Sequence, residues 1–212
     1  MPSFTWRRYG EHGLLIEVAE LADVHDLHRR VMFSGLARES VPGATTLYVE
    51  ARTELQLDPA TLAARICELP PVATSQANVR MHTIPVRYDG PDLENIAALT
   101  GLSVEEVILR HSAPTYTVAF VGFSRGFPYF AGLDPSIIVP RLASPRTLVP
   151  KGSVGMGAGF TGIYPESSPG GWRLLGTTDM EFFDPSKDPP TAFATGDLVR
   201  FVSTATRSRP TT

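Results

Sequence analysis

Cysteine is almost absent from this chain, and the single Cys67 excludes an internal disulfide. Chains poor in cysteine are typical of reducing compartments, so we expect a cytoplasmic protein. No apolar run approaches the roughly 20 residues that a membrane-spanning helix needs. The first 18 residues also lack the long apolar core of a signal peptide. We therefore expect no membrane partner.

The chain also lacks an excess of basic residues, because it has 19 lysines and arginines against 22 aspartates and glutamates, a formal net charge of −3. Nucleic-acid binding needs clustered Lys and Arg, so we expect no nucleic-acid partner. Histidine occurs five times, and His25 and His28 lie three apart on a predicted helix. Two ligands without a third at useful spacing do not make a metal site, and we predict none.

Motifs for nucleotide binding and serine catalysis are incomplete. Residues 157–162 match G-x-G-x-x-G, but a proline follows almost at once, so the helix that would receive a pyrophosphate is missing. We predict a glycine-rich bend between strands instead. Residues 122–126 match G-x-S-x-G around Ser124, yet the hydrolase order requires a downstream histidine and the last one is His111.

Glycine and proline are concentrated between residues 122 and 176, which hold 11 of the 18 glycines and seven of the 19 prolines. Such a density excludes a regular helix. Apolar β-formers interrupt it at residues 136–139, 153–156 and 172–175. Short strands between tight turns, as in a closed or strongly bent sheet, fit this pattern.

The N-terminal part has helix and strand periods instead. Residues 21–33 repeat apolar side chains at helical spacing before Gly35, and Asp58 with Pro59 begins a second helix. Strands are predicted at 45–50 and 80–88. These elements predict an α/β lobe over residues 1–85. A helical insert follows at 91–111, where Ser103 and Glu106 have the spacing of a capping box.

Longer motifs resemble a known family. They are GFPYFAGLDP, two Pro-Arg pairs, VPKGSVG and TGIYPESSPGGW. These resemble the B subunits of bacterial 5-oxoprolinase, a family also described as Kip-type kinase inhibitors and as allophanate hydrolase subunit 1. The resemblance implies an α+β fold with a ferredoxin-like N-terminal lobe and a cyclophilin-like β-barrel over residues 86–212. It also implies partners, namely the C subunit and an A-subunit homologue.

The activity implied by the resemblance is ATP-dependent hydrolysis of the lactam 5-oxoproline to L-glutamate. ATP, with Mg, would be bound by the assembled complex, since this chain shows no recognisable motif for it. An unactivated lactam needs a general base and a group that stabilises negative charge. His111 is the predicted base, and Arg141 or Arg146 is predicted to clamp the substrate carboxylate or to stabilise the developing negative charge. Two alternatives stay open: His111 is a helix-end histidine bonded to a carbonyl, and the arginines form surface or inter-strand salt bridges.

Four further residues are predicted to contact substrate: Phe127, Tyr129, Glu166 and Trp172. Phe160 stands where the family usually has Gln, which is a departure from the pattern. Two other functions stay open. One is a Kip-type inhibitor that binds a sensor histidine kinase and catalyses nothing. The other is a component related to urea amidolyase that acts with a biotinylated partner.

Overall fold

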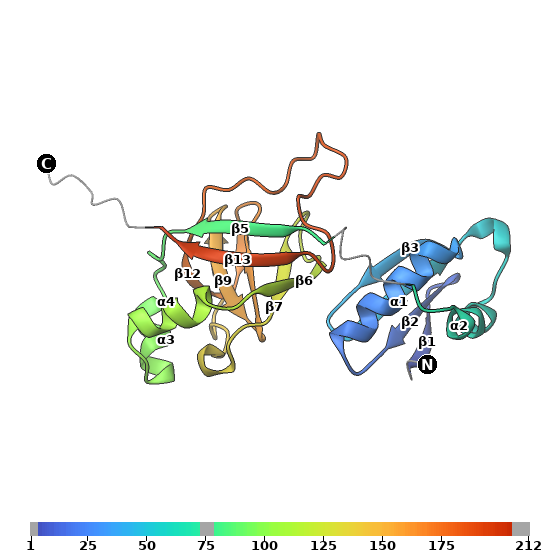
Figure 1. The fold of residues 1–212 in the computed structure, drawn as a ribbon, viewed down its shortest axis with the longest axis horizontal. Coiled ribbons are helices and arrows are strands. Elements are labelled where there is room, and N and C mark those ends of the chain that lie inside the picture. Colours follow the sequence, from blue (N-terminus) through green and yellow to red (C-terminus); the bar gives the residue numbers. More distant parts are fainter. Residues whose placement is uncertain (1–3, 73–78, 205–212) are drawn as a thin grey trace, which may run out of the picture. The chain divides into compact units, whose positions relative to one another are not determined.

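Residues 4–72 and 79–204 are described by the structure, a computed structural model, and they form two compact units (Figure 1). The division falls between Asn78 and Val79. Each unit combines helices with a sheet, and the second contains a barrel-like sheet, so the expected α+β architecture is confirmed. No helix within the described ranges is long and apolar enough to cross a membrane.

The first unit is a four-stranded antiparallel sheet with two helices. Its elements are β1 (Thr5–Tyr9), β2 (Gly13–Glu17), α1 (Leu21–Ser34), β3 (Ala37–Pro42), β4 (Thr46–Ala51), the short 3₁₀ helix η1 (Thr53–Leu55) and α2 (Pro59–Glu68). The strand order is β1-β2-β4-β3. Alternate residues of β2, Leu14 and Ile16, are fully buried in the core that the helices cover.

The helix ends of the first unit agree with the sequence prediction. Gly35 ends α1 with φ 70°, in the left-handed region that glycine tolerates. Asp58 begins α2, where its Oδ1 accepts hydrogen bonds from the backbone N–H groups of Ala60 at 2.9 Å and Thr61 at 3.0 Å. The strand β3 is not predicted, because half of its six residues are polar and its apolar residues do not alternate along the strand.

The second unit is built on a seven-stranded sheet of order β12-β9-β10-β7-β6-β13-β5. Arg87 follows β5, and Thr177 ends β12. Their backbones exchange two hydrogen bonds of 2.9 and 2.8 Å, which nearly closes the sheet into a barrel. β8 and β11 form a separate pair. The elements are β5 (Met81–Val86), α3 (Leu93–Thr100), α4 (Val104–Ser112), β6 (Tyr116–Val121), β7 (Pro128–Ala131), the short helix η3 (Pro135–Ile137), β8 (Arg146–Val149), β9 (Ser153–Gly157), β10 (Phe160–Ile163), β11 (Ser168–Gly170), β12 (Arg173–Thr177) and β13 (Leu198–Ser203).

The predicted boundary at residue 85 is wrong. The strand expected to complete the first lobe is β5, and it pairs in parallel with β13, with Ile84 opposite Phe201. Ile84 and Val86 are buried in the core of the second unit. An alternation of apolar residues predicts a strand but does not show which sheet the strand joins. The prediction therefore placed β5 with the elements that precede it in the chain.

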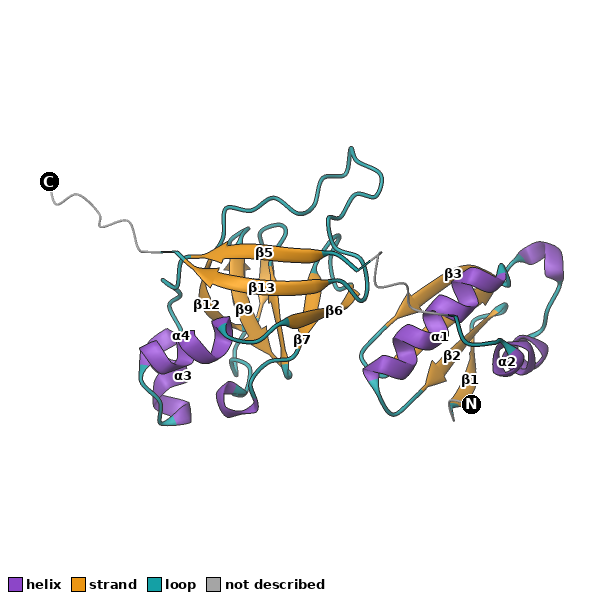
Figure 2. Ribbon diagram, viewed as in Figure 1, coloured by secondary structure: helices purple, strands orange, loops and turns teal. Residues whose placement is uncertain are grey.

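The helical insert is α3 and α4, which pack against β12 and β13 respectively (Figure 2). The predicted capping box is present, since Ser103 Oγ accepts from Glu106 N at 3.1 Å and Glu106 Oε2 accepts from Ser103 N at 2.8 Å. The strand predicted at 136–139 is wrong. Pro135 fixes a helical φ at that point, and Asp134 caps the short helix η3 instead.

Candidate functional site

Three predicted substrate residues lie in one cluster of rings on the second unit. Trp172 contacts both Phe127 and Tyr129, with ring centroids 5.3 and 5.4 Å apart. Phe120, Phe160 and Tyr164 join the same cluster. We call these six residues the aromatic platform: Phe120, Phe127, Tyr129, Phe160, Tyr164 and Trp172.

The platform lies on the outer face of the barrel. Side chains alternate along β7, so Phe130 is buried in the barrel core while its neighbour Tyr129 faces the opposite side. Phe127 and Trp172 are only 2% and 5% exposed, so they support the partly exposed Tyr129 and Phe160 rather than form the surface themselves. The surface available to a ligand is therefore made by Phe120, Tyr129 and Phe160.

Glycines beneath the platform explain the glycine-rich sequence of β9 and β10. A Cβ on Gly157 would lie 2.6 Å from the Trp172 ring, and one on Gly162 would lie 2.5 Å from the Pro128 carbonyl oxygen. Only glycine leaves room for the indole ring and the Pro128 carbonyl against these strands. The turn between them, at Ala158 and Gly159, has φ of 54° and 81° and leads directly into β10. The predicted bend is confirmed, and no helix follows it to hold a phosphate.

Arg141 is the predicted site residue that remains available beside the platform. Its side chain is exposed and forms no hydrogen bond or ion pair within residues 4–72 and 79–204. A Cβ on Gly171 would lie 3.7 Å from its Nε and Nη2. Burial raises the pKa of Tyr129, and the nearby Arg141 guanidinium offsets part of that rise. Tyr129 thus keeps its proton at neutral pH and can donate a hydrogen bond beside a free cation.

Arg146 is engaged inside the unit instead. Its Nη2 lies 2.8 Å from Oδ1 of Asp92, a carboxylate only 6% exposed, and its Nη1 lies 3.4 Å from the Trp172 carbonyl oxygen. The other oxygen of Asp92 accepts from the backbone N–H of Leu174 at 2.7 Å. Arg146 therefore joins the start of α3 to β12, and its guanidinium is not free to clamp a substrate carboxylate.

We expect Arg146→Ala to lower the free energy of unfolding of the second unit by about 1–3 kcal/mol, because it leaves the Asp92 carboxylate buried without its charged partner. Urea unfolding followed by Trp172 fluorescence measures this once Trp6, the only other tryptophan, is replaced by Phe. Arg200→Ala, at an exposed residue of β13, is the control and should change stability little. An Arg146→Ala chain of unchanged stability would restore Arg146 as a ligand group.

His111 is completely buried, with 0% of its surface exposed. Tyr88 Oη lies 2.8 Å from its Nδ1, and Thr161 Oγ1 lies 2.8 Å from its Nε2. Thr161 donates its own proton to the Gly155 carbonyl oxygen at 3.0 Å. Nε2–H must therefore donate to Thr161, and Nδ1 must accept from Tyr88.

This arrangement weighs against the predicted role of His111 as a general base. Both ring nitrogens are already bonded, so no lone pair remains for a water or substrate proton. Burial lowers the pKa of His111 to about 3, which keeps the imidazole neutral. The ring also packs, tilted by 35°, against Phe201 of the barrel core, with centroids 4.7 Å apart. The catalytic role stays a prediction, whereas the contacts describe a core histidine.

Glu166 is not brought into the platform by any contact. It is exposed on the loop between β10 and β11 and forms no hydrogen bond or ion pair with the described part of the chain. Phe120 and Tyr164, by contrast, were not predicted. Phe120 stacks on Tyr129 at 4.3 Å, and the two residues are cross-strand neighbours on β6 and β7. The alternation of residues 115–121 predicts the strand β6, but it does not show that β6 pairs with β7.

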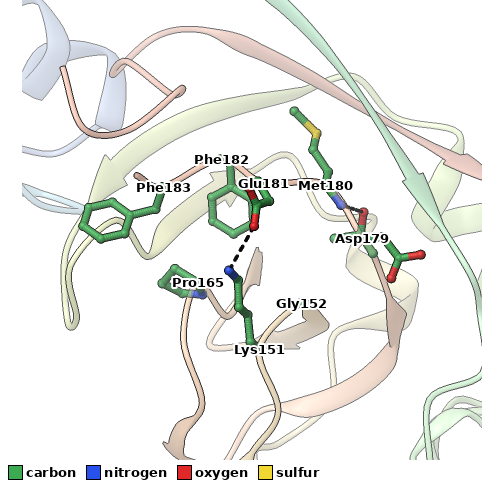
Figure 3. Close-up of a pocket in the computed structure, with 9 residues that line it drawn as sticks. Lys151, Gly152, Pro165, Asp179, Met180, Glu181, Phe182 and Phe183 are labelled. Carbon is green, nitrogen blue, oxygen red and sulfur yellow. Dashed lines mark hydrogen bonds and ion pairs between the residues drawn. The ribbon is translucent and has the colours of Figure 1, made fainter. Parts of the chain in front are cut away.

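A pocket of about 230 Å³ lies elsewhere on the second unit and contains none of the predicted residues. Figure 3 shows Lys151 reaching toward Glu181 across it, at 3.5 Å, with Phe182 and Phe183 alongside. Asp179 at its edge is paired with Arg87 at 2.6 Å. Because these charges satisfy one another, the platform with its unpaired Arg141 is the better site. No cluster of three metal-binding side chains occurs among the described residues.

Comparison with known proteins identifies the family. Residues 4–193 match the model of the carboxyltransferase domain, subdomains C and D. The 5-oxoprolinase B subunit of Escherichia coli O157:H7 is 43% identical over 169 residues, which cover 77% of each chain.

Solved structures agree with this match. The crystal structure of TTHA0988 superposes with a TM-score of 0.78 at 34% identity; the match covers 94% of this chain but only 41% of TTHA0988. The Kluyveromyces lactis urea amidolyase shares the fold, with a TM-score of 0.74 at 20% identity over 96% of this chain and 15% of that protein. The chain therefore belongs to the family of carboxyltransferase C and D subdomains that includes the 5-oxoprolinase B subunits.

Proposed function

We propose that the chain is the B component of an ATP-dependent 5-oxoprolinase, which hydrolyses 5-oxoproline to L-glutamate together with C and A subunits. The observation that carries this proposal is the 43% identity with the 5-oxoprolinase B subunit of Escherichia coli O157:H7, over 77% of both chains. We place this assembly in the cytoplasm as part of the same proposal. The name of that relative specifies a subunit, which supports a multi-chain enzyme.

The contribution that we propose for this chain is substrate binding on the aromatic platform. 5-Oxoproline is a small, nearly planar lactam with one carboxylate. Arg141 supplies a planar guanidinium fork for the carboxylate, and the Tyr129 hydroxyl supplies a hydrogen-bond donor for an oxygen atom. The rings of Phe120 and Phe160, which meet edge-on at 5.7 Å, offer apolar surface to the lactam ring.

The described residues do not fit the phosphates of ATP. The glycine-rich turn leads into a strand, not into a helix whose N-terminus could receive a phosphate. We therefore assign ATP to a partner subunit. The general base is assigned to a partner as well, because His111 has no free nitrogen.

The isolated chain should accordingly show no turnover of 5-oxoproline. ATP hydrolysis coupled to glutamate release is to be measured for the chain alone, for the candidate C and A subunits without it, and for all three together. We expect activity only in the complete mixture. Robust glutamate release by the chain alone would contradict the proposal, and so would full activity of the partners without it.

The two other functions stay predictions. The likeness to urea amidolyase, at 20% identity, shows the fold alone. Inhibition of a sensor kinase requires a protein-binding surface, which an oxoprolinase component requires too. An assembly that cleaves 5-oxoproline would favour the enzyme over both.

A further inference from the structure

Phe123 is a large apolar side chain held out into solvent. It is 72% exposed, and it lies on the loop that joins β6 to β7. Its φ is 69°, a region that bulky side chains rarely adopt. The Ser124 N–H donates to the Gly122 carbonyl oxygen at 2.9 Å, which makes Phe123 the centre of a tight γ-turn. A phenylalanine that is mostly exposed in a strained turn adds little to the core and does not relieve the backbone.

The surrounding loop holds this turn in one conformation. Gly122 N–H donates to the Phe127 carbonyl at 3.0 Å, and Phe127 N–H donates to the Ser124 carbonyl at 3.1 Å. Gly126, at φ 75°, lies against the ring of Phe183, which a Cβ would approach to 2.4 Å. The ring of Phe123 meets Phe127 edge-on at 5.7 Å. Phe123 is thus presented rigidly, so little side-chain entropy remains to be lost when it binds.

The charged residue of the loop 122–127 is Arg125. Arg125 is exposed on the same loop, and neither it nor Arg141 forms an ion pair within the described ranges. Phe127 connects the two regions, because it contacts Phe123 and also Tyr129 and Trp172 of the platform. An exposed aromatic with an unpaired arginine is the composition of an interface anchor.

We propose that Phe123 and Arg125 form the anchor for a protein partner that offers an apolar cavity edged by Asp or Glu carboxylates. Two arginines on a chain of net charge −3 do not make the basic track that nucleic acid requires. A partner seated on Phe123 would cover one edge of the aromatic platform through Phe127. The choice of the C subunit as that partner rests on the proposed function.

The experiment is isothermal titration calorimetry of the full chain with the purified candidate C subunit. We expect Phe123→Ala to raise Kd by on the order of 30-fold, the effect of one interface hot spot. Arg125→Glu should weaken binding as well, because it opposes the partner's carboxylates. Phe33→Ala is the matched control, since Phe33 is 82% exposed on α1 of the first unit, and it should change Kd less than twofold.

Phe123→Gly gives a second readout that a structural role would not produce. Glycine accepts the positive φ, so the melting temperature of this variant should be unchanged or higher while binding is lost. Equal Kd values for the wild-type chain and Phe123→Ala, or no binding by the wild-type chain, would overturn the proposal. Tight binding of a single-stranded oligonucleotide that Phe123→Ala abolishes would overturn it too.

Parallel assays of 5-oxoproline turnover separate the two proposals. If an assembly cleaves 5-oxoproline and Phe123→Ala changes neither its formation nor its turnover, the proposed function stands and the anchor is wrong. An assembly that depends on Phe123 but does not cleave 5-oxoproline would keep the anchor and remove the proposed function.

Discussion

Replacing Arg141 by alanine should raise the KM of the assembled enzyme for 5-oxoproline by about 10- to 100-fold, the usual effect of losing a hydrogen-bonded charge. The cause is the loss of the unpaired guanidinium beside Tyr129. Arg141→Lys should have a smaller effect, because lysine keeps the charge but loses the bidentate fork. Steady-state kinetics across 5-oxoproline concentrations measures both.

The controls for Arg141 separate binding from folding. The melting temperature of Arg141→Ala should match that of the wild-type chain, since the side chain is exposed and forms no ion pair with the described residues. Arg200→Ala removes another exposed arginine and should leave KM unchanged. An Arg141→Ala enzyme with normal KM would move the substrate carboxylate to another residue.

The loss of His111 should have a large effect on the stability of the second unit. His111→Asn should lower the free energy of unfolding of the second unit by about 2–4 kcal/mol at pH 7, because the shorter side chain cannot reach both Tyr88 and Thr161. A histidine acting as a base at an open helix end would tolerate Asn in its fold and lose catalysis instead. Because His111 is buried and bonded to Tyr88 and Thr161, we expect His111→Asn to lower the stability of the fold, not catalysis alone.

The effect of His111 depends on pH in a defined direction. The folded state keeps the imidazole neutral, with a pKa of about 3, whereas an unfolded histidine titrates near 6.5. Between these values the unfolded state binds the extra proton, so the wild-type chain loses up to about 1.4 kcal/mol per pH unit as pH falls below 6.5. His111→Asn lacks this contribution, and the difference between the two chains should shrink toward pH 5.

Urea unfolding of the Trp6→Phe chain, followed through Trp172, tests this from pH 7.5 to 5. His12→Asn, at an exposed histidine of the first unit, is the control and should behave like the parent. Parallel pH profiles for the parent and His111→Asn would contradict the neutral buried imidazole. A stable His111→Asn chain whose assembly has lost catalysis would restore His111 as the base.

Local signals predicted much of the fold. Helix ends at Gly35, Asp58 and Ser103 depend on residues next to them in the chain, so they can be recognised without a structure. The glycine and proline density between 122 and 176 likewise predicted short strands. The partner of β5 could not be predicted, since pairing with β13 joins residues more than 100 positions apart.

The candidate site was predictable in its residue types but not in their roles. Arg141 and Arg146 look alike in sequence, because each follows a proline. The structure shows that Arg146 forms an ion pair with Asp92, whereas Arg141 forms none with the described residues. His111 ends a helix whether it is a base or a core residue. Its burial depends on Tyr88, Thr161 and Phe201, which come from three different strands or loops.

We expect 5-oxoproline to bind on the aromatic platform of this chain. A structure of the reconstituted assembly with 5-oxoproline and a non-hydrolysable ATP analogue tests it most directly. We expect the substrate carboxylate within hydrogen-bond distance of Arg141, with the lactam ring against Tyr129 and Phe160. Density for 5-oxoproline wholly within a partner subunit, with Arg141 still facing solvent, would show that the platform is not the substrate site.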